Sequence, residues 1–310
     1  MSPLTIAIPS KGRLKEACEA FFAECGFRVR QEGGARGYRA SLDGLPEASV
    51  LLLSAREIAE GLIDGTFHVG VTGEDLLHDL AETPGETAMV LKQLGFGHAD
   101  VVVAVPEAWL DVVTMADLEA AGALFRETHG RRMRVATKYM RLTRRFFAAR
   151  SVGAYRLVYS AGATEAAPAS GAAELIVDIT TTGATLAANG LKVLSDGVML
   201  KSEASLCVSL AADWTDAAHG GLSSLLLPIE ARARAKGEAI LTAQEKIPES
   251  LVDAHDLQRH GDRAIRCTPD EATKLSQLIS AAGCGPVSIV RADFLFEAES
   301  HLYKKFASKL

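Results

Sequence analysis

A short apolar run that leads into a turn of small and hydroxyl-bearing residues constrains this chain more than any other feature. The run is residues 175–179 (LIVDI), long enough for one buried strand, and the turn is residues 180–185 (TTTGAT). Residues 184–189 favour a helix, so the backbone N–H groups of residues 182–186 should be exposed at its start. Such donors attract a phosphate group, and Gly183 lets the backbone approach it closely. The pattern predicts an α/β chain with an anion-binding loop.

The loop alone leaves the question of a ligand open, because a strand, a threonine turn and a helix occur in many α/β proteins that bind nothing there. A longer pattern of fixed spacings narrows the choice. It consists of Glu165, Gly171, Ile176, Asp178, Thr182, Gly183, Thr185 and Leu186. This pattern closely resembles the signature of ATP phosphoribosyltransferase, the enzyme family that opens histidine biosynthesis.

The resemblance covers residues 4 to about 240 and implies a two-lobed α/β fold similar to type II periplasmic binding proteins, with a ligand cleft between the lobes. We expect residues 1–98 and 190–225 to form lobe I. Residues 99–189, with the phosphoribosyl-binding loop, should form lobe II. A β-branched strand at residues 100–105 leads into lobe II, and strands at 191–194 and 205–210 should return to lobe I.

The family transfers a phosphoribosyl group from 5-phosphoribosyl 1-pyrophosphate to N1 of ATP, so the resemblance implies a pentosyltransferase that releases pyrophosphate. Adenine N1 is a weak nucleophile, so positioning must supply much of the rate. Cleavage of the C1–O bond puts charge onto the departing pyrophosphate, which calls for cations and Mg²⁺ on that side. We therefore expect Mg²⁺ as cofactor, carried by the substrates and held by the protein through Asp178 at most, and we assign no general base.

Two cations flank a glycine after the first expected strand, residues 5–8, in the sequence Lys11-Gly12-Arg13. Open α/β sheets place ligands at the carboxyl ends of strands, and Lys and Arg both suit a pyrophosphate. A solvated turn is the alternative for so short a motif. We expect Lys11 and Arg13 to neutralise the pyrophosphate, and Asp178 with Glu165 to hold the ribose hydroxyls.

Two more strand ends are expected to line the cleft. The strand at residues 68–72 runs into a turn similar to the family's GxDxL segment, although its two acids could simply start a helix. The strand that begins near residue 135 ends beside Thr137 and Lys138. The expected substrate-binding residues are Glu165, Thr181, Thr182, Gly183, Ala184, Thr185, Leu186, Gly73, Glu74, Asp75, Leu76, Thr137 and Lys138.

The chain departs from the family pattern at two places. Thr181 stands where many members have a glutamate, which leaves Asp178 as the only acid of the loop. Ser54 stands where the family often has the arginine of an RxxDIP segment. One expected anion contact is therefore missing unless Arg56 replaces it.

Length, charge and cysteine content narrow the class of protein. A chain of 310 residues is too long for one typical core, and a formal net charge of −6 argues against a general nucleic-acid surface. The sequence has neither a membrane-spanning run nor a signal-peptide pattern, so we expect a cytoplasmic protein that binds neither nucleic acid nor membranes. Five scattered cysteines without a CxxC pair predict neither a disulfide framework nor a zinc site.

Residues 226–310 are expected to form a C-terminal helix and an extension, with a regulatory role left open. The helix should cover residues 228–242, starting at Pro228. Short strands are expected at residues 263–267 and 286–290, and a helix at 297–310. Long-form members of the family carry a ferredoxin-like, histidine-binding domain here, and short-form members depend on a regulatory subunit resembling histidyl-tRNA synthetase. Because the domain pattern is not evident, the sequence slightly favours a short-form-like catalytic chain with an extension of its own. We also expect a homo-oligomer, and a regulatory subunit resembling histidyl-tRNA synthetase is left open as a partner.

Several motifs of other enzyme classes are absent. The chain has no GxxxxGK[ST], no GxGxxG opening a βαβ unit, no HExxH and no GxSxG, which argues against a P-loop ATPase, a dehydrogenase, a zinc hydrolase and an α/β-hydrolase. Two alternatives stay open. One is a cytoplasmic small-molecule sensor on the same two-lobed fold, and the other is a phosphoribosyltransferase that uses a different base.

Overall fold

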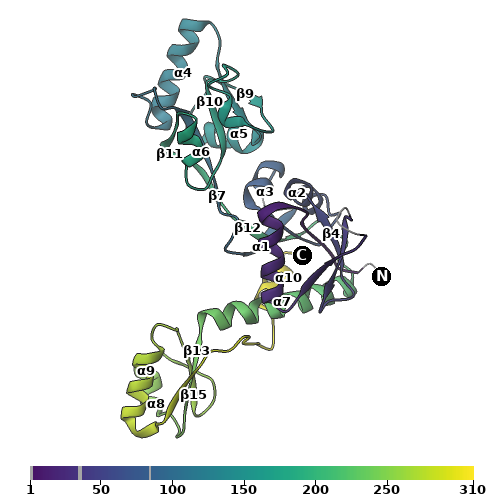
Figure 1. The fold of residues 1–310 in the computed structure, drawn as a ribbon, viewed down its shortest axis with the longest axis vertical. Helices are drawn as coiled ribbons and strands as arrows, with labels where there is room; N and C mark the ends of the chain where they lie inside the picture. The colour runs from purple at the N-terminus through teal and green to yellow at the C-terminus, as the bar shows by residue number, and fades with distance from the viewer. Residues whose placement is uncertain (1–2, 34–36, 84) are drawn as a thin grey trace.

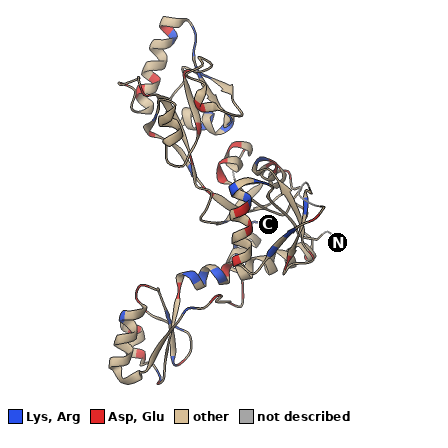
Figure 2. Cartoon of the chain, in the orientation of Figure 1, with Lys and Arg blue, Asp and Glu red and all other residues tan. Residues whose placement is uncertain are grey.

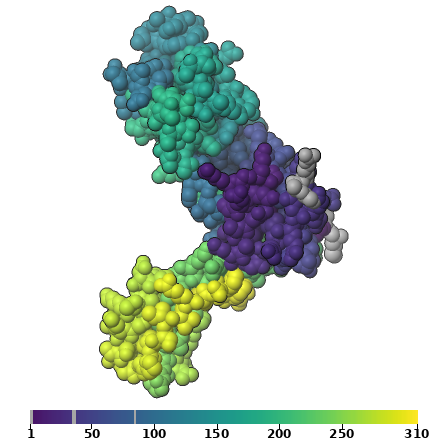
Figure 3. Space-filling model, viewed as in Figure 1, coloured from purple at the N-terminus to yellow at the C-terminus, as the bar shows by residue number. Residues whose placement is uncertain are grey.

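The computed structural model describes residues 3–33, 37–83 and 85–310, and it places them in three bodies joined in a row (Figure 1). Lobe I, mostly purple in Figure 3, lies between lobe II in teal and a yellow C-terminal domain. Among the helices of the described residues, none combines the length and apolar character that crossing a membrane requires.

Lobe I is built on a seven-stranded sheet with the order β2-β3-β4-β1-β5-β12-β6. β4 and β5 are parallel to β1, and β12 is antiparallel to β5. The strands are β1 (Thr5–Pro9), β2 (Arg28–Gln31), β3 (Arg39–Asp43), β4 (Ser49–Leu53), β5 (Val69–Gly73), β6 (Ala88–Gln93) and β12 (Ala204–Ser209). The helices are α1 (Gly12–Glu24), α2 (Ala55–Ile63) and α3 (Glu74–Leu80). The strands expected at residues 5–8 and 68–72 are confirmed within a residue or two.

Lobe II is built on a five-stranded sheet with the order β11-β7-β10-β8-β9. Its strands are β7 (Ala99–Pro106), β8 (Met133–Thr137), β9 (Tyr155–Tyr159), β10 (Leu175–Thr180) and β11 (Leu191–Ser202). Its helices are α4 (Met115–His129), α5 (Met140–Ala149), α6 (Ala184–Ala188) and the short 3-10 helix η1 (Thr164–Ala166). The buried valines of β7 fit its place inside the sheet, between β11 and β10.

The return to lobe I comes later than the sequence analysis placed it. β11 pairs along its length with β7, from Leu191 opposite Pro106 to Ser202 opposite Ala99. The strand that begins at residue 191 therefore belongs to lobe II, and the boundary expected at residue 190 is wrong. A bulge between Val193 and Val198 lets this long strand stay paired. The chain crosses back only at Ser202, just before β12.

Both lobes repeat one strand order. With β2 and β3 of lobe I left out and the remaining strands numbered along the chain, the order is 2-1-3-n-4, where n is the antiparallel strand that begins at a crossing between the lobes. In lobe I these strands are β4-β1-β5-β12-β6, and in lobe II they are β9-β8-β10-β7-β11. The two-lobed, type II arrangement expected from the sequence is confirmed.

Helix α7 (Asp216–Gly237) leads from lobe I to the C-terminal domain, and its last turns carry basic residues (Figure 2). The hydroxyl of Thr215 accepts the N–H of Ala218 and caps the helix start. The expected start at Pro228 is wrong, because this proline lies inside the helix, which buried neighbours such as Leu226 and Ile229 hold in place. The end expected at residue 242 is also wrong, since residues 239–243 form a strand.

The C-terminal domain is a four-stranded antiparallel sheet with two helices. Its order is β14-β15-β13-β16, and its succession is βαββαβ. This is the ferredoxin-like arrangement, so the slight preference for a chain without such a domain is wrong. The elements are β13 (Ala239–Ala243), α8 (Glu249–Ala254), β14 (Gln258–Arg259), β15 (Ala264–Cys267), α9 (Ala272–Ile279), the π-helical turn η2 (Ser280–Cys284) and β16 (Val287–Val290).

The chain returns from the C-terminal domain to lobe I through α10 (His301–Ala307). Phe306 is fully buried in the core of lobe I, with its ring 4.5 Å from that of Trp214. The N–H of Leu302 donates to Glu230 on α7 at 3.0 Å. The C-terminal domain is therefore an insertion whose two ends are both anchored in or beside lobe I.

Candidate active site

The carboxyl ends of the parallel strands in both lobes lie at the crossing between the lobes. β7 and β12 each begin at this crossing, and each runs antiparallel to a strand that ends there. In lobe II, Thr180 at the end of β10 lies opposite Asp100, and in lobe I, Gly73 at the end of β5 lies opposite Ala204. Since ligands of open α/β sheets bind at these strand ends, the space between the lobes is the candidate active site.

The loop after β10 is a tight turn held by its own hydroxyl groups. The N–H of Gly183 donates to Thr180 Oγ1 at 2.8 Å, and Thr181 Oγ1 donates to the carbonyl oxygen of His98 at 3.0 Å. Gly183 has a φ of 77° and immediately precedes α6. This left-handed conformation favours glycine. The loop is thereby tethered to the segment that enters β7.

Three amides of this loop have room for an anion. Within the described residues, the N–H groups of Thr182, Thr185 and Leu186 meet no hydrogen-bond acceptor, and that of Ala184 has only a 3.4 Å contact with Thr182 Oγ1. Thr182, Ala184 and Thr185 are exposed. Unpaired donors at the start of a helix are a favourable place for a phosphate group.

Asp178 lies at the end of β10, with other predicted site residues around its half-buried carboxylate. Burial raises the pKa of Asp178, and the N–H of Ile179, which donates to Oδ1 at 2.8 Å, opposes that rise. The charge of Lys138 also lowers this pKa, the charge of Glu165 raises it, and the Thr164 hydroxyl hydrogen-bonds to it. The fold therefore brings Asp178, Glu165 and Lys138 together from three separate segments.

Lys11 and Arg13 are exposed at the start of α1. Hydrogen bonds from Ser54 lower the pKa of Glu57, and the charge of Lys11 lowers it further. The ends of β1 and β4 are therefore neighbours. Ser54 caps α2, because its Oγ accepts the N–H of Glu57 at 3.3 Å while its own N–H donates to Glu57 Oε2 at 2.8 Å.

Arg56, the residue that could replace the arginine missing at position 54, pairs with an acid on its own helix. Its Nε lies 2.9 Å from Glu60 Oε1, one turn along α2. The side chain is about half exposed, so this ion pair is weak and a ligand anion could compete for it.

The turn after β5 is held by contacts within the protein. Glu74 Oε1 accepts from Gln93 at 2.9 Å and from Ser205 Oγ at 3.0 Å. Gly73 must lack a side chain, since a Cβ there would lie 2.1 Å from Asp75 Oδ1. Leu76 packs against the cores of both lobes. These residues therefore fix the shape of the turn beside the candidate site through contacts within the protein.

Asp75 joins the two lobes through buried hydrogen bonds. Tyr139 Oη donates to Asp75 Oδ2 at 2.6 Å, and Ser202 Oγ donates to Asp75 Oδ1 at 2.8 Å. Burial and the charge of Asp75 both raise the pKa of Tyr139, which keeps its hydroxyl protonated as the donor. Asp75 lies in lobe I, whereas Tyr139 and Ser202 lie in lobe II. This group is called the interlobe triad below.

A second contact joins α3 of lobe I to α5 of lobe II. Asp79 Oδ1 accepts the N–H groups of Arg141 and Leu142 at 2.9 and 3.0 Å, so it caps the start of α5. Arg145 donates to the carbonyl oxygen of His78. The lobes therefore meet through directed polar contacts.

Thr137 and Lys138 differ in what they offer a ligand. Thr137 is fully buried, and its Oγ1 accepts the N–H of Tyr139 at 2.9 Å, so its hydroxyl shapes the turn. Lys138 Nζ lies 4.9 Å from the centre of the Tyr139 ring and close to Asp178. Of the two, Lys138 is the one placed to meet an anion.

A hollow of about 320 Å³ opens between the lobes beside these contacts. Arg56 and Asp64 line it from lobe I, and Lys138, Arg141 and Tyr159 line it from lobe II. Its volume falls in the range of small-molecule sites, roughly 300–1,000 Å³. Three cations, Arg56, Lys138 and Arg141, and three acids, Glu60, Asp64 and Asp79, line this interlobe space.

Sequence reasoning did not identify Tyr139, Ser202 and Asp79 as residues that join the lobes. Tyr139 and Asp75 are 64 positions apart, and Ser202 and Asp75 are 127 apart. No local pattern pairs them, because their contact depends on how two separate sheets face each other. No sequence pattern indicated that the hydroxyl of Thr164 lies beside Asp178 either.

The protein offers no metal cage of its own in the described residues, where no group of three or more His, Cys, Asp or Glu could hold an ion. Asp178 and Glu165 supply two nearby carboxylates at the candidate site. Mg²⁺ is commonly held by one or two carboxylates together with substrate phosphates and water. The residues present therefore fit a Mg²⁺ ion that arrives with a substrate.

Sequence comparisons with known proteins point to one family. The family model described as HisG, ATP phosphoribosyltransferase, matches residues 54–230. A curated ATP phosphoribosyltransferase from Caulobacter vibrioides is 50% identical over 316 residues, covering 100% of this chain and 98% of the relative. One from Rhodopseudomonas palustris is 48% identical over 320 residues, covering 99% and 98%.

Among solved structures, an ATP phosphoribosyl transferase (HisG:HisZ) complex from Thermotoga maritima has a similar fold. The TM-score is 0.56 at 23% identity, and the match covers 73% of this chain and 96% of that one. The matched chain is therefore shorter, and part of the present fold has no counterpart in it.

Proposed function

The chain belongs to the ATP phosphoribosyltransferase family, and from that premise we propose that the loop after β10 holds the 5-phosphate of 5-phosphoribosyl 1-pyrophosphate. The enzyme transfers the phosphoribosyl group to N1 of ATP and releases pyrophosphate, the first step of histidine biosynthesis. The free amides of Thr182, Thr185 and Leu186 are the donors that would bind the phosphate oxygens.

Asp178 and Glu165 are proposed to hold the ribose hydroxyls. Both lie beside the loop, and an ionised carboxylate accepts hydrogen bonds from two adjacent hydroxyls. As the C1–O bond breaks, the ribose ring gains positive charge, which a nearby carboxylate stabilises. Lys138 lies close to Asp178 and helps keep it ionised.

Lys11 and Arg13 are proposed to meet the departing pyrophosphate from lobe I. They are exposed at the carboxyl end of β1, and such strand ends are where open α/β sheets bind ligands. Mg²⁺, when bound with the pyrophosphate, would neutralise part of its developing charge. The chain itself supplies orientation and cations, and the step requires no covalent nucleophile.

The interlobe hollow is proposed to receive part of the ATP. Arg56, Lys138 and Arg141 line it, and their charges suit a triphosphate. Holding N1 of adenine against C1 of the ribose is the main task, because a poor nucleophile gains most from fixed geometry. The interlobe triad and the cap of α5 by Asp79 would hold the site residues of lobe I and those of lobe II in a fixed position relative to each other.

The C-terminal domain is proposed to be regulatory. Its βαββαβ order supports the long-form reading of the family, in which such a domain binds histidine.

A homo-oligomer and a cytoplasmic location are proposed as well, the latter because ATP and the phosphoribosyl donor are both metabolites of that compartment. A separate regulatory subunit resembling histidyl-tRNA synthetase is then not required, although the solved relative is a complex of two proteins.

The observation that carries the assignment of the loop is its set of unpaired amides at the end of β10, and Gly183→Val tests it. The side chain would crowd the amides around residue 183, so we expect the KM for the phosphoribosyl donor to rise at least tenfold, with the KM for ATP little changed.

Gly190→Val is the matched control, because Gly190 also has a positive φ, 66°, and a Cβ added at either glycine would meet no atom within 4 Å. Both variants carry the same backbone strain, but only Gly183 lies in the loop. Steady-state assays would follow absorbance of the ribosylated product. Equal donor KM values for the two variants would remove the loop from phosphate binding.

A further inference from the structure

Five arginines gather around one hollow of lobe II that phosphoribosyl transfer does not use. The hollow has a volume of about 680 Å³. The arginines are Arg131, Arg132, Arg134, Arg144 and Arg156. Val152, Tyr155 and Leu157 supply the apolar part of the wall. Such a concentration of positive charge stands out in a chain whose formal net charge is −6.

The hollow lies at the end of the sheet opposite to the candidate active site. Arg131 and Arg132 precede β8, and Gly153 precedes β9, so these residues mark where the two strands begin. The same strands end beside Lys138 and the interlobe space. Each is five residues long, which separates the two ends by roughly 15 Å. A substrate held in the interlobe space therefore does not fill this hollow.

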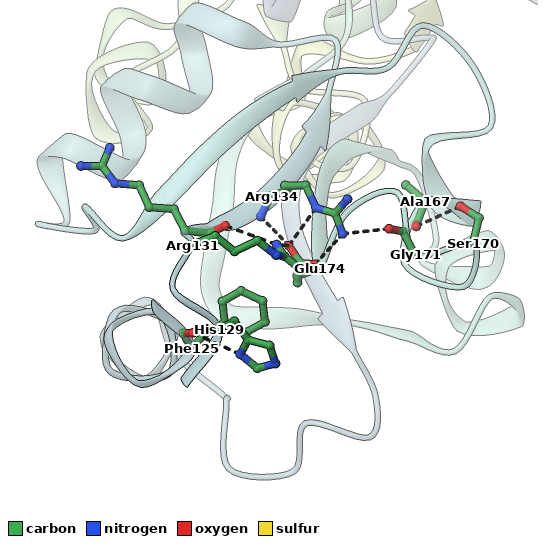
Figure 4. Close-up of polar contacts among 9 residues, drawn as sticks. Phe125, His129, Arg131, Arg134, Ala167, Ser170, Gly171 and Glu174 are labelled. Atoms are coloured by element: carbon green, nitrogen blue, oxygen red, sulfur yellow. Dashed lines mark hydrogen bonds and ion pairs between the residues drawn. The ribbon is translucent and has the colours of Figure 1, made fainter. Parts of the chain in front are cut away.

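Two of the five arginines already have an acidic partner. Arg131 Nη2 and Arg134 Nη2 lie 3.0 and 2.8 Å from Glu174 Oε1 (Figure 4). Burial raises the pKa of Glu174, but hydrogen bonds from Arg134 and Arg131 outweigh that effect and bring it down to about 2. The other carboxylate nearby, Glu119, accepts the N–H groups of Gly153 and Ala154.

The other three arginines are unpaired. Within the described part of the chain, Arg132, Arg144 and Arg156 have neither a hydrogen bond nor an ion pair from their guanidinium groups, and all three are exposed. Arg132 and Arg144 both act electrostatically on the Tyr155 hydroxyl, so they converge on one place. Arg156 lies directly opposite Arg134 on the neighbouring strand, and like charges in that position repel. An anion in the hollow would relieve this repulsion.

We propose that this hollow is a second anion site, separate from the site of phosphoribosyl transfer, and that it takes a small ligand with two or more linked phosphoryl groups. Three guanidinium forks offer more donors than one phosphoryl group can accept, whereas a chain of phosphoryl groups can meet them in pairs. The volume suits a ligand of nucleotide size, and the apolar wall beside Tyr155 gives its uncharged part a surface.

Calorimetric titration of the full chain with inorganic tripolyphosphate tests the proposal. The measurements use a background of Lys11→Ser, Arg13→Ser, Arg56→Ser and Lys138→Ser, which removes most of the cations proposed to bind pyrophosphate and triphosphate between the lobes. Adding Arg132→Gln, Arg144→Gln and Arg156→Gln should weaken tripolyphosphate binding at least tenfold. Arg150→Gln is the control, because Arg150 is an exposed arginine that stacks on Phe146, 3.9 Å from the ring centre, outside the hollow. It should bind as tightly as the background.

Without the background changes, the three glutamine substitutions should leave kcat and both KM values within twofold of the unchanged enzyme, since the hollow lies away from the reacting atoms. Tripolyphosphate affinity within twofold of the control, or orthophosphate binding as tight as tripolyphosphate, would overturn the proposal. If circular dichroism shows that the triple variant does not fold, Arg144→Gln and Arg156→Gln are measured singly. Each should weaken binding at least threefold, and no weakening in both would also overturn it.

Discussion

Removing the hydroxyl of Tyr139 should destabilise the contact between the lobes by a measurable amount. Tyr139→Phe keeps the ring, which is only 1% exposed, but leaves Asp75 Oδ2 without its 2.6 Å donor. Asp75 is 8% exposed, so water reaches it poorly. A buried acceptor without a partner costs about 1–3 kcal/mol, and a charged one costs more. We expect a loss of about 2–3 kcal/mol in the free energy of unfolding.

Thermal unfolding followed by circular dichroism would measure this loss. At roughly 2–4 °C per kcal/mol for a unit of 150–250 residues, the Tm should fall by about 4–12 °C. Tyr159→Phe is the control, because Tyr159 is 61% exposed and its hydroxyl faces solvent at the end of the neighbouring strand. Its Tm should stay within about 1 °C of the unchanged protein, as surface changes usually do.

Ser202→Ala extends the same test to the other oxygen of Asp75. Ser202 Oγ donates to Asp75 Oδ1 at 2.8 Å, so the two substitutions remove two donors from one carboxylate. The losses of stability caused by removing two groups that share a partner are not additive. The loss in the double variant should differ from the sum of the two single losses by more than about 0.5 kcal/mol. A Tm for Tyr139→Phe equal to that of Tyr159→Phe would show that the interlobe triad does not stabilise the contact, and strictly additive losses would show that its members act independently.

Three further predictions concern charge and regulation. Asp178→Asn should lower kcat by roughly two orders of magnitude or more, as loss of a preorganised electrostatic contact can. Burial raises the pKa of Asp178. Its carboxyl group therefore stabilises the folded state at low pH, and this contribution is lost as pH rises through the folded pKa. The Tm of Asp178→Asn at pH 7 should be equal to or above that of the unchanged protein. Glu174→Gln should lower the Tm at pH 7, because the pKa of Glu174 is reduced to about 2 in the folded protein. The stabilising contribution of Glu174 is present above its unfolded pKa, about 4.3, and is lost as pH falls toward 2. At that pH the Tm values of Glu174→Gln and of the unchanged protein should be equal. Histidine should inhibit the purified chain in a steady-state assay, and inhibition that appears only after a second protein is added would assign regulation to a partner subunit.

The strands and the loop could be predicted from the sequence because each rests on a local pattern. The apolar run at residues 175–179 and the β-branched run at 100–105 fix central strands whatever surrounds them, and the structure has both. The exposed turn at Gly183 follows from residue types that favour it, and its φ of 77° confirms the need for glycine.

The helix across Pro228 and the C-terminal domain could not be predicted in the same way. A proline is a good first helical residue, so residue 228 was expected as a start, but tertiary packing of Leu226 and Ile229 keeps α7 continuous there. In the C-terminal domain, β14 has two residues and α8 has six. Elements this short carry too few residues for a periodicity to show.

In the candidate site, sequence reasoning found the residues on each strand end but not how they are used. Asp75 was expected to face a substrate, and the structure buries it against Tyr139 and Ser202. Thr137 was expected beside an anion, and its hydroxyl holds the Tyr139 amide. Both differences arise where one lobe meets the other, and such contacts depend on the orientation of whole sheets.

The anchoring of α10 in lobe I decides how the C-terminal domain can be studied by truncation. A chain cut after Gly237 would lose Phe306 together with the domain, and the slot beside Trp214 would stand open to water. Any fall in activity would then reflect damage to the core of lobe I and not the loss of regulation by the C-terminal domain. Excising residues 238–297 and rejoining α7 to α10 with a short flexible linker keeps that slot filled and isolates the contribution of the inserted domain.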